Sequence, residues 1–542
     1  MKNMNVVNRY LVALLVGGAG MRLWAAPPVL VSVEPALQAR IADTFEVDAF
    51  TVQQLQVLNG IAAGPINLDV DLAGTHHAID LHPHSLRSPD FKLMIDDGSG
   101  ELHEARAPPD NTWRGTVRND KNGEVGIVAS SFVNNHFMAT LVMHNGEQWG
   151  IQAVNEAVPG VSGNAYVVYN ARDSRPGPWT CGQDALAPAD VGPVMEGGGG
   201  IAGALLDVEI AFDADREFYQ LNGSSTTNTV NDITSIMNSV EAIYLSQTDI
   251  TYTITQVIVR TAEPDPYNTS VPQTLLEQFG TRWNNFHYAV TRDVAHMMTG
   301  RDMDGSVIGI AWLSVMCTSP TLAYGVSQSR YTNNFTNRVA LTAHEIGHNW
   351  SAQHCNGDPD CGIMCASLGG CPGGVTQFGT TPKNAIIACR NSHTCFNSPQ
   401  LPPNDSCNQA RQINFGSNEF TNAAATNSGP TESNCQFSGS AINGDVWFHL
   451  TQTCSGLMTA SVCGATFDTR IAVYNGCPSG SNQAVACNDN SCGTASSVTF
   501  WATRGDYYIR VGGASGAFGT GFLNVTCTAG PANNECIAAE AI

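Results

Sequence analysis

The periodicity of hydrophobic and polar positions changes twice along the chain. Between residues 27 and 180, apolar and polar residues alternate over short runs, such as 126–132 and 137–142, with turn residues between the runs. Successive side chains of a strand point to opposite faces of a sheet. The alternation therefore predicts a β-rich first unit.

The pattern of apolar residues changes near residue 205. Residues 205–212 are typical of a buried strand, and apolar residues then recur at helical spacing from Val230 to Tyr244. Strand-like runs at 250–259 and 307–315 flank a helix expected over 274–299. This order of strands and helices predicts an α/β domain over residues 202–398.

Helical periodicity disappears from about residue 404. Short strand-like runs at 445–451, 470–474 and 507–511 lie between Gly, Asn and Ser turns, which predicts an all-β sandwich over residues 404–529. The segment that begins at Pro402 is echoed from Pro531 onward. Residues 530–542 are therefore expected to begin a second, incomplete module.

Two connecting segments carry signals of their own. Residues 187–201 contain Pro188 and Pro193 together with a run of glycines, and they are expected to be a linker open to proteolytic cutting. Near the N-terminus, Lys2 and Arg9 carry positive charges. A short apolar run begins at Tyr10, and the small residues Ala25 and Ala26 follow it. This pattern predicts a signal peptide over residues 1–26, and hence a secreted, extracellular protein.

Composition narrows the function classes. A chain of 542 residues is too long for one hydrophobic core. The net charge of −22 disfavours binding to nucleic acid or to an anionic membrane surface. No later apolar stretch reaches about 18 residues, so no membrane anchor is expected. The 17 cysteines lie almost wholly in the second half, which in an exported chain predicts disulfides.

The segment from His344 to His354 carries the candidate chemistry. His344 and His348 are four residues apart on a helix, so both rings leave the same side and can bind one metal ion. Imidazole suits Zn²⁺, and His354 would supply a third ligand after the helix ends near residues 349–351. A fourth position is then left for water, and Glu345 is predicted to be the general base that acts on this metal-activated water.

These residues resemble the zinc signature of the metzincin metalloproteases, in the form of the adamalysin/reprolysin branch. Segments 293–300 and 305–312 resemble the same branch, and residues 361–365 resemble its Met-turn, which implies that Met364 lies beneath the metal. Residues 112–117 and the strands after them resemble a reprolysin prodomain. The resemblance covers about 100–395 and implies a zinc endopeptidase that acts on proteins or peptides and is made as a latent precursor.

The expected fold is therefore multidomain, with a β-rich prodomain at 27–186, an α/β metzincin-like catalytic domain and an all-β C-terminal sandwich. One position departs from the family pattern. Members usually carry Gly three residues after the second histidine, where the chain turns, and this sequence has Ser351. Serine at this position must accept a strained backbone or adopt another turn.

The resemblance implies two further sites. Cys181, in Trp179-Thr-Cys-Gly182, resembles a cysteine switch, in which a thiolate takes the fourth zinc position and inhibits the precursor. The rival interpretation is a disulfide to the later domains. Glu209 and Asp293 lie where two ligands of a structural Ca²⁺ fall in the family; the alternative is a pair of solvated or salt-bridged carboxylates.

Other functions stay open at this point. The chain could be a secreted adhesion or binding protein with a degenerate protease domain, although an intact Glu345 argues against this. It could also be a metal-dependent hydrolase of a non-peptide bond, but the run at 307–315 favours peptide binding by strand addition. The C-terminal unit loosely resembles sandwich modules of secreted bacterial proteases and is expected either to bind substrate or a surface or to be removed on export. Residues 487–492 resemble a small calcium or disulfide loop, and His82 and His84 are expected to be loop histidines.

Overall fold

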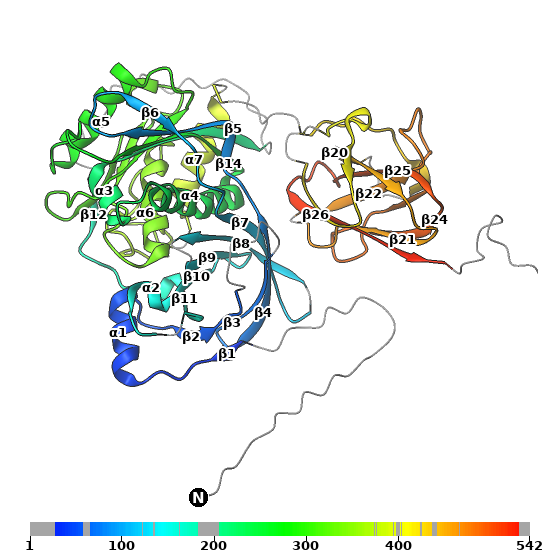
Figure 1. The fold of residues 1–542 in the computed structure, drawn as a ribbon, viewed down its shortest axis with the longest axis horizontal. Coiled ribbons are helices and arrows are strands. Elements are labelled where there is room, and N and C mark those ends of the chain that lie inside the picture. The colour runs from blue at the N-terminus through cyan, green and yellow to red at the C-terminus, as the bar shows by residue number, and fades with distance from the viewer. Residues whose placement is uncertain are drawn as a thin grey trace, which may run out of the picture.

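The computed structural model describes residues 28–57, 66–121, 123–133, 136–161, 163–182, 205–372, 374–375, 377–393, 395–396, 402, 404–422, 425–435, 442–465 and 467–530. The predicted signal peptide, the linker at 187–201 and the repeat from Pro531 lie outside these residues. Within the described part, the strands form four sheets that build three units (Figure 1). No helix there combines the length and the hydropathy that crossing a bilayer requires.

The first unit is an antiparallel sheet with the order β1-β2-β11-β10-β9-β8-β7-β4-β3. The alternating runs predicted as strands at 126–132 and 137–142 are confirmed in β8 and β9. The elements are β1 (Val29–Leu30), α1 (Pro35–Phe45), β2 (Thr51–Gln54), β3 (Ile66–Leu72), β4 (Thr75–Pro83), β7 (Thr112–Arg118), β8 (Glu124–Val133), β9 (His136–Met143), β10 (Gln148–Ala153), α2 (Val154–Ala157) and β11 (Ala165–Asn170).

The second unit is a mixed sheet, mostly parallel, that carries helices, with the order β12-β16-β17-β15-β13-β14-β5-β6. Its core order of strand and helix agrees with the predicted α/β domain. Besides β5 and β6, the elements are β12 (Thr180–Cys181), β13 (Leu206–Ala214), α3 (Arg216–Leu221), α4 (Thr226–Thr248), β14 (Ile250–Arg260), α5 (Pro272–Phe286), β15 (Val294–Met298), β16 (Val307–Ala311), β17 (Tyr324–Ser327), α6 (Phe335–Asn349) and α7 (Thr380–Ser392).

One predicted element in this unit is wrong. The helix expected over 274–299 ends at Phe286, and Val294–Met298 forms strand β15 instead. All five residues of β15 are buried. A short, continuous apolar run of this kind has no alternation, so periodicity alone does not separate a buried strand from a helix.

The outermost strands of this sheet come from the first unit. Strands β4 and β7 are neighbours in the first sheet, but the chain between them leaves that sheet and forms β5 (Arg87–Asp96) and β6 (Leu102–Ala105). β5 pairs with β14 in parallel, and β6 pairs with β5. We call residues 84–111 the arm. It reaches across to the far edge of the second sheet (Figure 1), an arrangement that the sequence analysis did not predict.

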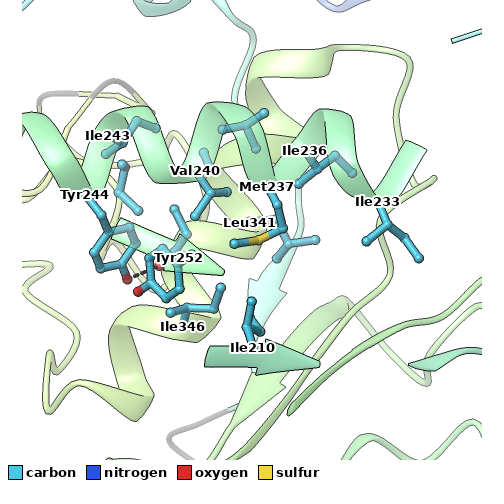
Figure 2. Packing of buried hydrophobic residues seen from close by; sticks show 14 of the residues in the cluster. Ile210, Ile233, Ile236, Met237, Val240, Ile243, Tyr244, Tyr252, Leu341 and Ile346 are labelled. Atoms are coloured by element: carbon cyan, nitrogen blue, oxygen red, sulfur yellow. Dashed lines mark hydrogen bonds between the residues drawn. The ribbon is translucent and has the colours of Figure 1, made fainter. Parts of the chain in front are cut away.

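Helix α4 joins the sheet to the helix that carries the histidines. Its apolar face, which the sequence predicted from the helical spacing of Val230 to Tyr244, packs on β13 and on α6 (Figure 2). The hydroxyl of Ser225 caps its first turn by accepting from the backbone N–H of Asn228 at 3.3 Å. At the other end, the hydroxyl of Tyr244 donates to the carbonyl of Ala343 at 2.9 Å, so α4 fixes the position of α6.

The C-terminal unit is a sandwich of two sheets, as predicted, with orders β18-β20-β25-β22-β23 and β19-β26-β21-β24. Its elements are β18 (Arg411–Ile413), β19 (Gly416–Thr421), β20 (Asn443–Gln452), β21 (Gly456–Ser461), β22 (Thr469–Tyr474), β23 (Ala486–Asn488), β24 (Ser497–Ala502), β25 (Gly505–Gly513) and β26 (Thr520–Ala529). Cys487 pairs with Cys435 and Cys492 with Cys463, so these two cysteines do not close a loop together.

Candidate metal centre

Helix α6 presents the first two histidines. Asn334 caps its N-terminus by accepting from the backbone N–H of Asn337 at 3.1 Å, and the helix ends at Asn349, within the predicted range. The whole helix is buried, with His348 fully inaccessible and His344 only 2% exposed. A fully buried helix that carries polar residues at its centre requires partners for them, so this segment is built around its side-chain chemistry.

The three histidines meet at their Nε2 atoms. Nε2 of His344 lies 3.0 Å from Nε2 of His348 and 3.3 Å from Nε2 of His354. The i, i+4 spacing places the first two rings one turn apart, and the chain reversal after the helix returns His354 to them. The three residues predicted to act together from sequence are therefore brought together.

The opposite ring nitrogens hold two of the imidazoles in place. Nδ1 of His344 lies 2.6 Å from the carbonyl of Ile363, and Nδ1 of His348 lies 2.7 Å from the carbonyl of Ala352. Because a carbonyl only accepts, each Nδ1 carries the proton and each Nε2 offers a lone pair. Burial, together with the charge on His354, lowers the pKa of His344 to about 3, so this ring is neutral.

The donor atoms fit a tetrahedral zinc ion. Zinc–nitrogen bonds of about 2.05 Å at tetrahedral angles place two ligand nitrogens about 3.3 Å apart, and a zinc-bound sulfur lies about 3.5 Å from each of them. The measured separations agree with these values. Cys181, His344, His348 and His354 form a group whose ligand atoms all lie within 4.8 Å of one another, so the cluster can hold a metal ion.

Glu345 lies beside the histidines with its carboxyl group buried. The residue is completely inaccessible, and among the described residues its Oε1 atom has no hydrogen-bond partner. A Cβ atom placed on Gly309 of β16 would lie 2.2 Å from this oxygen, so only a glycine leaves room for the carboxyl group. Burial raises the pKa of Glu345 well above its ordinary value. A carboxyl group that has a raised pKa and an oxygen without a hydrogen-bond partner, next to a metal-binding cluster, is suited to proton transfer.

Cys181 reaches the same cluster from strand β12. Its Sγ atom lies 3.4 Å from Nε2 of His348 and 3.6 Å from Oε2 of Glu345. Strand β12 places it there by pairing in parallel with β16, with the N–H of Gly182 donating to the carbonyl of Gly309 at 2.8 Å. Cys181 lies outside the disulfides that the described residues form.

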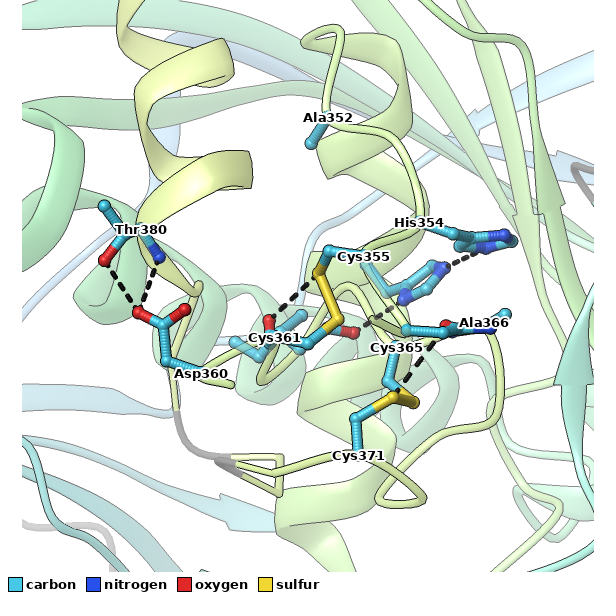
Figure 3. The surroundings of a disulfide bond; sticks show 12 residues. Ala352, His354, Cys355, Asp360, Cys361, Cys365, Ala366, Cys371 and Thr380 are labelled. Atoms are coloured by element: carbon cyan, nitrogen blue, oxygen red, sulfur yellow. Dashed lines mark hydrogen bonds between the residues drawn. A yellow bond between two sulfur atoms is a disulfide. The ribbon is translucent and has the colours of Figure 1, made fainter. Parts of the chain in front are cut away.

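The segment after His354 contains Met364 and two disulfides, which lie near His354 (Figure 3). Met364 is buried, and its sulfur would lie 2.8 Å from a Cβ atom on Gly347, so it packs directly against the histidine helix. Disulfides link Cys355 to Cys361 and Cys365 to Cys371, and the first of these closes the loop that begins immediately after His354. The chain that directly follows the third histidine is therefore held by disulfides.

Ser351 adopts the strained backbone that its sequence position predicts. Its φ angle is +78°, in the region that favours glycine. The N–H of Ser351 still donates to the carbonyl of His348 at 2.9 Å, and the next N–H reaches the carbonyl of Gly347 at 2.9 Å. The reversal is thus complete, and His354 reaches the cluster despite the missing glycine.

The two predicted calcium ligands lie side by side, away from this cluster. Oδ2 of Asp293 accepts from the backbone N–H of Glu209 at 2.9 Å. Burial raises the pKa of Asp293 to about 6, with the charges of Glu209 and Asp207 acting in the same direction. Within the described residues, these carboxylates do not form a cluster of three metal-ligand atoms. The calcium site stays a prediction.

Two family models match this chain, one after the other, between residues 205 and 521. Residues 205–404 match a reprolysin model described as metallo-peptidase family M12. Residues 403–521 match a model described as galactose binding domain-like. The first match contains the three histidines and Glu345, and the second coincides with the two-sheet C-terminal unit.

Proposed function

Because the chain carries a reprolysin-type metallopeptidase domain of family M12 followed by a galactose-binding-like domain, we propose that it is a secreted zinc endopeptidase made as a latent precursor. The observation that carries this proposal is the convergence of three histidine Nε2 atoms beside a buried carboxyl group. The disulfides in its second half support an extracellular location.

His344, His348 and His354 would hold the zinc ion through Nε2. When bound, zinc polarises a substrate carbonyl and lowers the pKa of a coordinated water to about 7. The carbonyls of Ile363 and Ala352 keep the first two rings in the required tautomer. Three protein ligands leave a fourth position, which is the arrangement of catalytic rather than structural zinc sites.

Glu345 is the general base in this proposal. Its carboxylate takes a proton from the attacking water and passes it to the nitrogen of the departing amine. The raised pKa supports this role, because burial increases the affinity of the carboxylate for a proton and so makes it a stronger base. Gly309 leaves the space in which the carboxyl group turns between the two partners.

An extended peptide would add to the edge of β16. This edge now pairs with β12, which shows that its backbone groups accept a strand. A small pocket opens beside it, lined by Ile308, Leu341 and Leu368 next to the histidines. An edge that pairs with an extended strand supports a peptide substrate over a small non-peptide one. The alternative of a binding protein with a degenerate site is not favoured, since Cys181 and the three histidines offer ligand atoms within 4.8 Å of one another.

The contact that β12 makes with β16 and with the metal cluster would also make the precursor latent. Cys181 would act as an inhibitory zinc ligand, and β12 would block the edge that a substrate needs. A cut in the linker at 187–201 is the proposed first step of activation. Glu209 and Asp293 are proposed as a calcium site remote from the zinc, and the C-terminal domain as a module that binds substrate or a surface.

The test is to replace Glu345 by Gln in the purified protein after the linker has been cut. We expect about one zinc per chain in both proteins, by the three-ligand arrangement, and hydrolysis of an unstructured protein by the wild type alone. Zinc content is measured by elemental analysis and cleavage by mass spectrometry. Zinc binding without cleavage by the cut wild type would overturn the proposal and restore the binding-protein interpretation.

A further inference from the structure

The last residue of the histidine helix has a buried side chain that the proposed mechanism does not use. Asn349 follows His348 directly, ends α6 and is fully inaccessible. Its Nδ2 atom donates to the carbonyl of Trp312 at 2.9 Å and to the carbonyl of Tyr324 at 3.1 Å. Because carbonyls only accept, the amide nitrogen must face both of them. The side chain therefore connects the end of α6 to two other places in the chain.

The two carbonyls lie where β16 ends and β17 begins. The last pair of the ladder between these strands joins Ala311 to Gly325. The N–H of Trp312 extends the ladder by donating to the carbonyl of Tyr324 at 3.3 Å. The amide of Asn349 thus holds the end of β16 and its pairing with β17 at the same point.

The chain beyond β16 also caps the end of α6. The N–H of Ser314 donates to the carbonyl of His348 at 2.9 Å, and the next two backbone N–H groups donate to the carbonyl of Asn349 at 3.1 and 3.2 Å. The last carbonyls of a helix have no partner within the helix, so this segment satisfies two of them from outside. We call residues 312–316 the clasp. Backbone bonds of the clasp and the side chain of Asn349 together join β16 to α6.

The amide of Asn349 is not an efficient source of stability. Its Oδ1 atom is buried, and among the described residues it has no hydrogen-bond partner. A buried acceptor without a partner lowers the stability of the folded state, because it has lost its hydrogen bonds to water. This loss offsets part of what the two donated bonds contribute. The specific effect of the side chain is therefore to hold β16 in place.

The position of β16 along α6 matters for both halves of the proposed reaction. Gly309 of β16 borders the carboxyl group of Glu345, since an added Cβ atom would lie 2.2 Å from Oε1. The edge of the same strand pairs with β12 and is the proposed site for an extended peptide. A misplacement of about 1 Å between reacting groups lowers a rate on the order of 100-fold. The link between β16 and the metal-binding turn of α6 therefore has to be exact to within a fraction of this distance.

We propose that Asn349 is a positioning residue that sets the register of a peptide on β16 relative to the metal ligands. Its amide fixes the end of β16 along α6, and a bound peptide takes its own position from the backbone of β16. The inference rests on the proposed function and adds to it the residue that aligns the scissile peptide bond with the metal. Asn349 acts through β16 in this role and does not need to touch the substrate.

The test separates binding at the metal from binding along β16. The protein with its linker cut is loaded with Co²⁺, and its visible absorption is titrated with two hydroxamates. Acetohydroxamate reaches only the metal, whereas a tripeptide hydroxamate also pairs with β16. For Asn349→Ala we expect the Kd of the tripeptide hydroxamate to rise at least about tenfold, as for the loss of one backbone hydrogen bond, and the Kd of acetohydroxamate to stay within about twofold of the wild-type value.

Asn222→Ala is the matched control. Asn222 is also a buried amide of the catalytic domain, 2% exposed, and its Nδ2 donates to the carbonyl of Phe218 of α3 at 3.0 Å. We expect this variant to have a lower melting temperature, as Asn349→Ala does, and to keep both Kd values of the wild type. Should Asn349→Ala fail to fold, Asn349→Ser replaces it, because one hydroxyl hydrogen cannot serve two carbonyls.

Two outcomes would overturn the proposal. Unchanged Kd values for both hydroxamates in the Asn349 variant would mean that the residue has a structural role only. An equal rise of both Kd values would place its effect at the metal site instead of along β16. Failure of the proposed function has a different signature, because the wild-type protein would then bind no Co²⁺ or would not respond to acetohydroxamate, and the inference would fall with it.

Discussion

The sulfur of Cys181 lies 3.4 Å from Nε2 of His348 and, on its other side, 3.6 Å from the carboxylate of Glu345. One atom of β12 therefore contacts both a proposed zinc ligand and the proposed general base. In the proposed mechanism, inhibition by this thiol would act on metal binding and on proton transfer together.

Replacing Cys181 by Ala should give the uncut precursor measurable activity. The thiol is removed, while β12 still covers part of the substrate edge, so we expect hydrolysis of short peptides above the uncut wild type and below the cut enzyme. The measurement is fluorogenic peptide cleavage by protein shown to be a single chain. Cys389→Ala is the control, because Cys389 is also outside the disulfides of the described residues and is not one of the clustered metal-ligand residues. Equal activity of both variants and the uncut wild type would contradict the inhibitory role.

Replacing Gly309 by Ala should lower activity without removing zinc. The new Cβ atom would lie 2.2 Å from Oε1 of Glu345 and 2.8 Å from a methyl group of Leu341, so the carboxyl group must move. A displacement of about 1 Å costs on the order of 100-fold in rate. We expect that loss in kcat/KM for the cut enzyme with unchanged zinc content. Gly357→Ala, where the added atom meets nothing within 4 Å, should keep full activity.

Replacing Ser351 by Gly should stabilise the catalytic domain. Serine at φ +78° costs about 1 kcal/mol, and glycine removes this strain at a partly offsetting entropic cost in the unfolded chain. We expect a higher melting temperature in calorimetry and equal or tighter zinc binding. Ser351→Val should act in the opposite direction, since a β-branched residue tolerates this conformation least. A lower melting temperature for the glycine variant would show that the serine hydroxyl matters more than the strain.

The carboxylates at the proposed calcium site predict a pH dependence. Burial, together with neighbouring charges, raises the pKa values of Asp207 and Asp293 to about 6. The folded protein then binds protons that the unfolded chain has already released, so these groups lower stability as pH rises from about 4 to about 6. Asp293→Asn should flatten this part of the profile in thermal unfolding. Millimolar calcium should raise the melting temperature of the wild type and leave the variant unchanged; equal effects on both would exclude Asp293 as a ligand.

The cluster could be predicted because its geometry is mostly local. Two of its histidines are one helical turn apart, and Glu345 is adjacent to the first, so helix geometry alone places three of the groups. His354 follows within one chain reversal. The strain at Ser351 could also be foreseen, because a single backbone angle decides it. These predictions required no knowledge of distant contacts.

The parts that sequence did not predict depend on distant pairings. Gly309 borders Glu345 only because β16 lies beside α6, and nothing in the pattern around Gly309 marks it. The carbonyl of Ile363 that holds His344 belongs to an irregular turn. The arm alternates like the other strands of the first unit, and a strand's own pattern does not name its partner. Its membership of the catalytic sheet is therefore visible only in the folded structure.

The arm also has a consequence for the order of synthesis. Asp96 leaves the ribosome 164 residues before Arg260, so β5 exists well before the strand that it joins. Until then it is an uncovered edge, and Pro89, Asp90 and Lys92 along it are residues that discourage pairing with other chains. Strand β14 of the catalytic sheet, in turn, finds its partner strand β5 already synthesised when it leaves the ribosome. A catalytic domain produced without the N-terminal unit would have to fold with this edge bare.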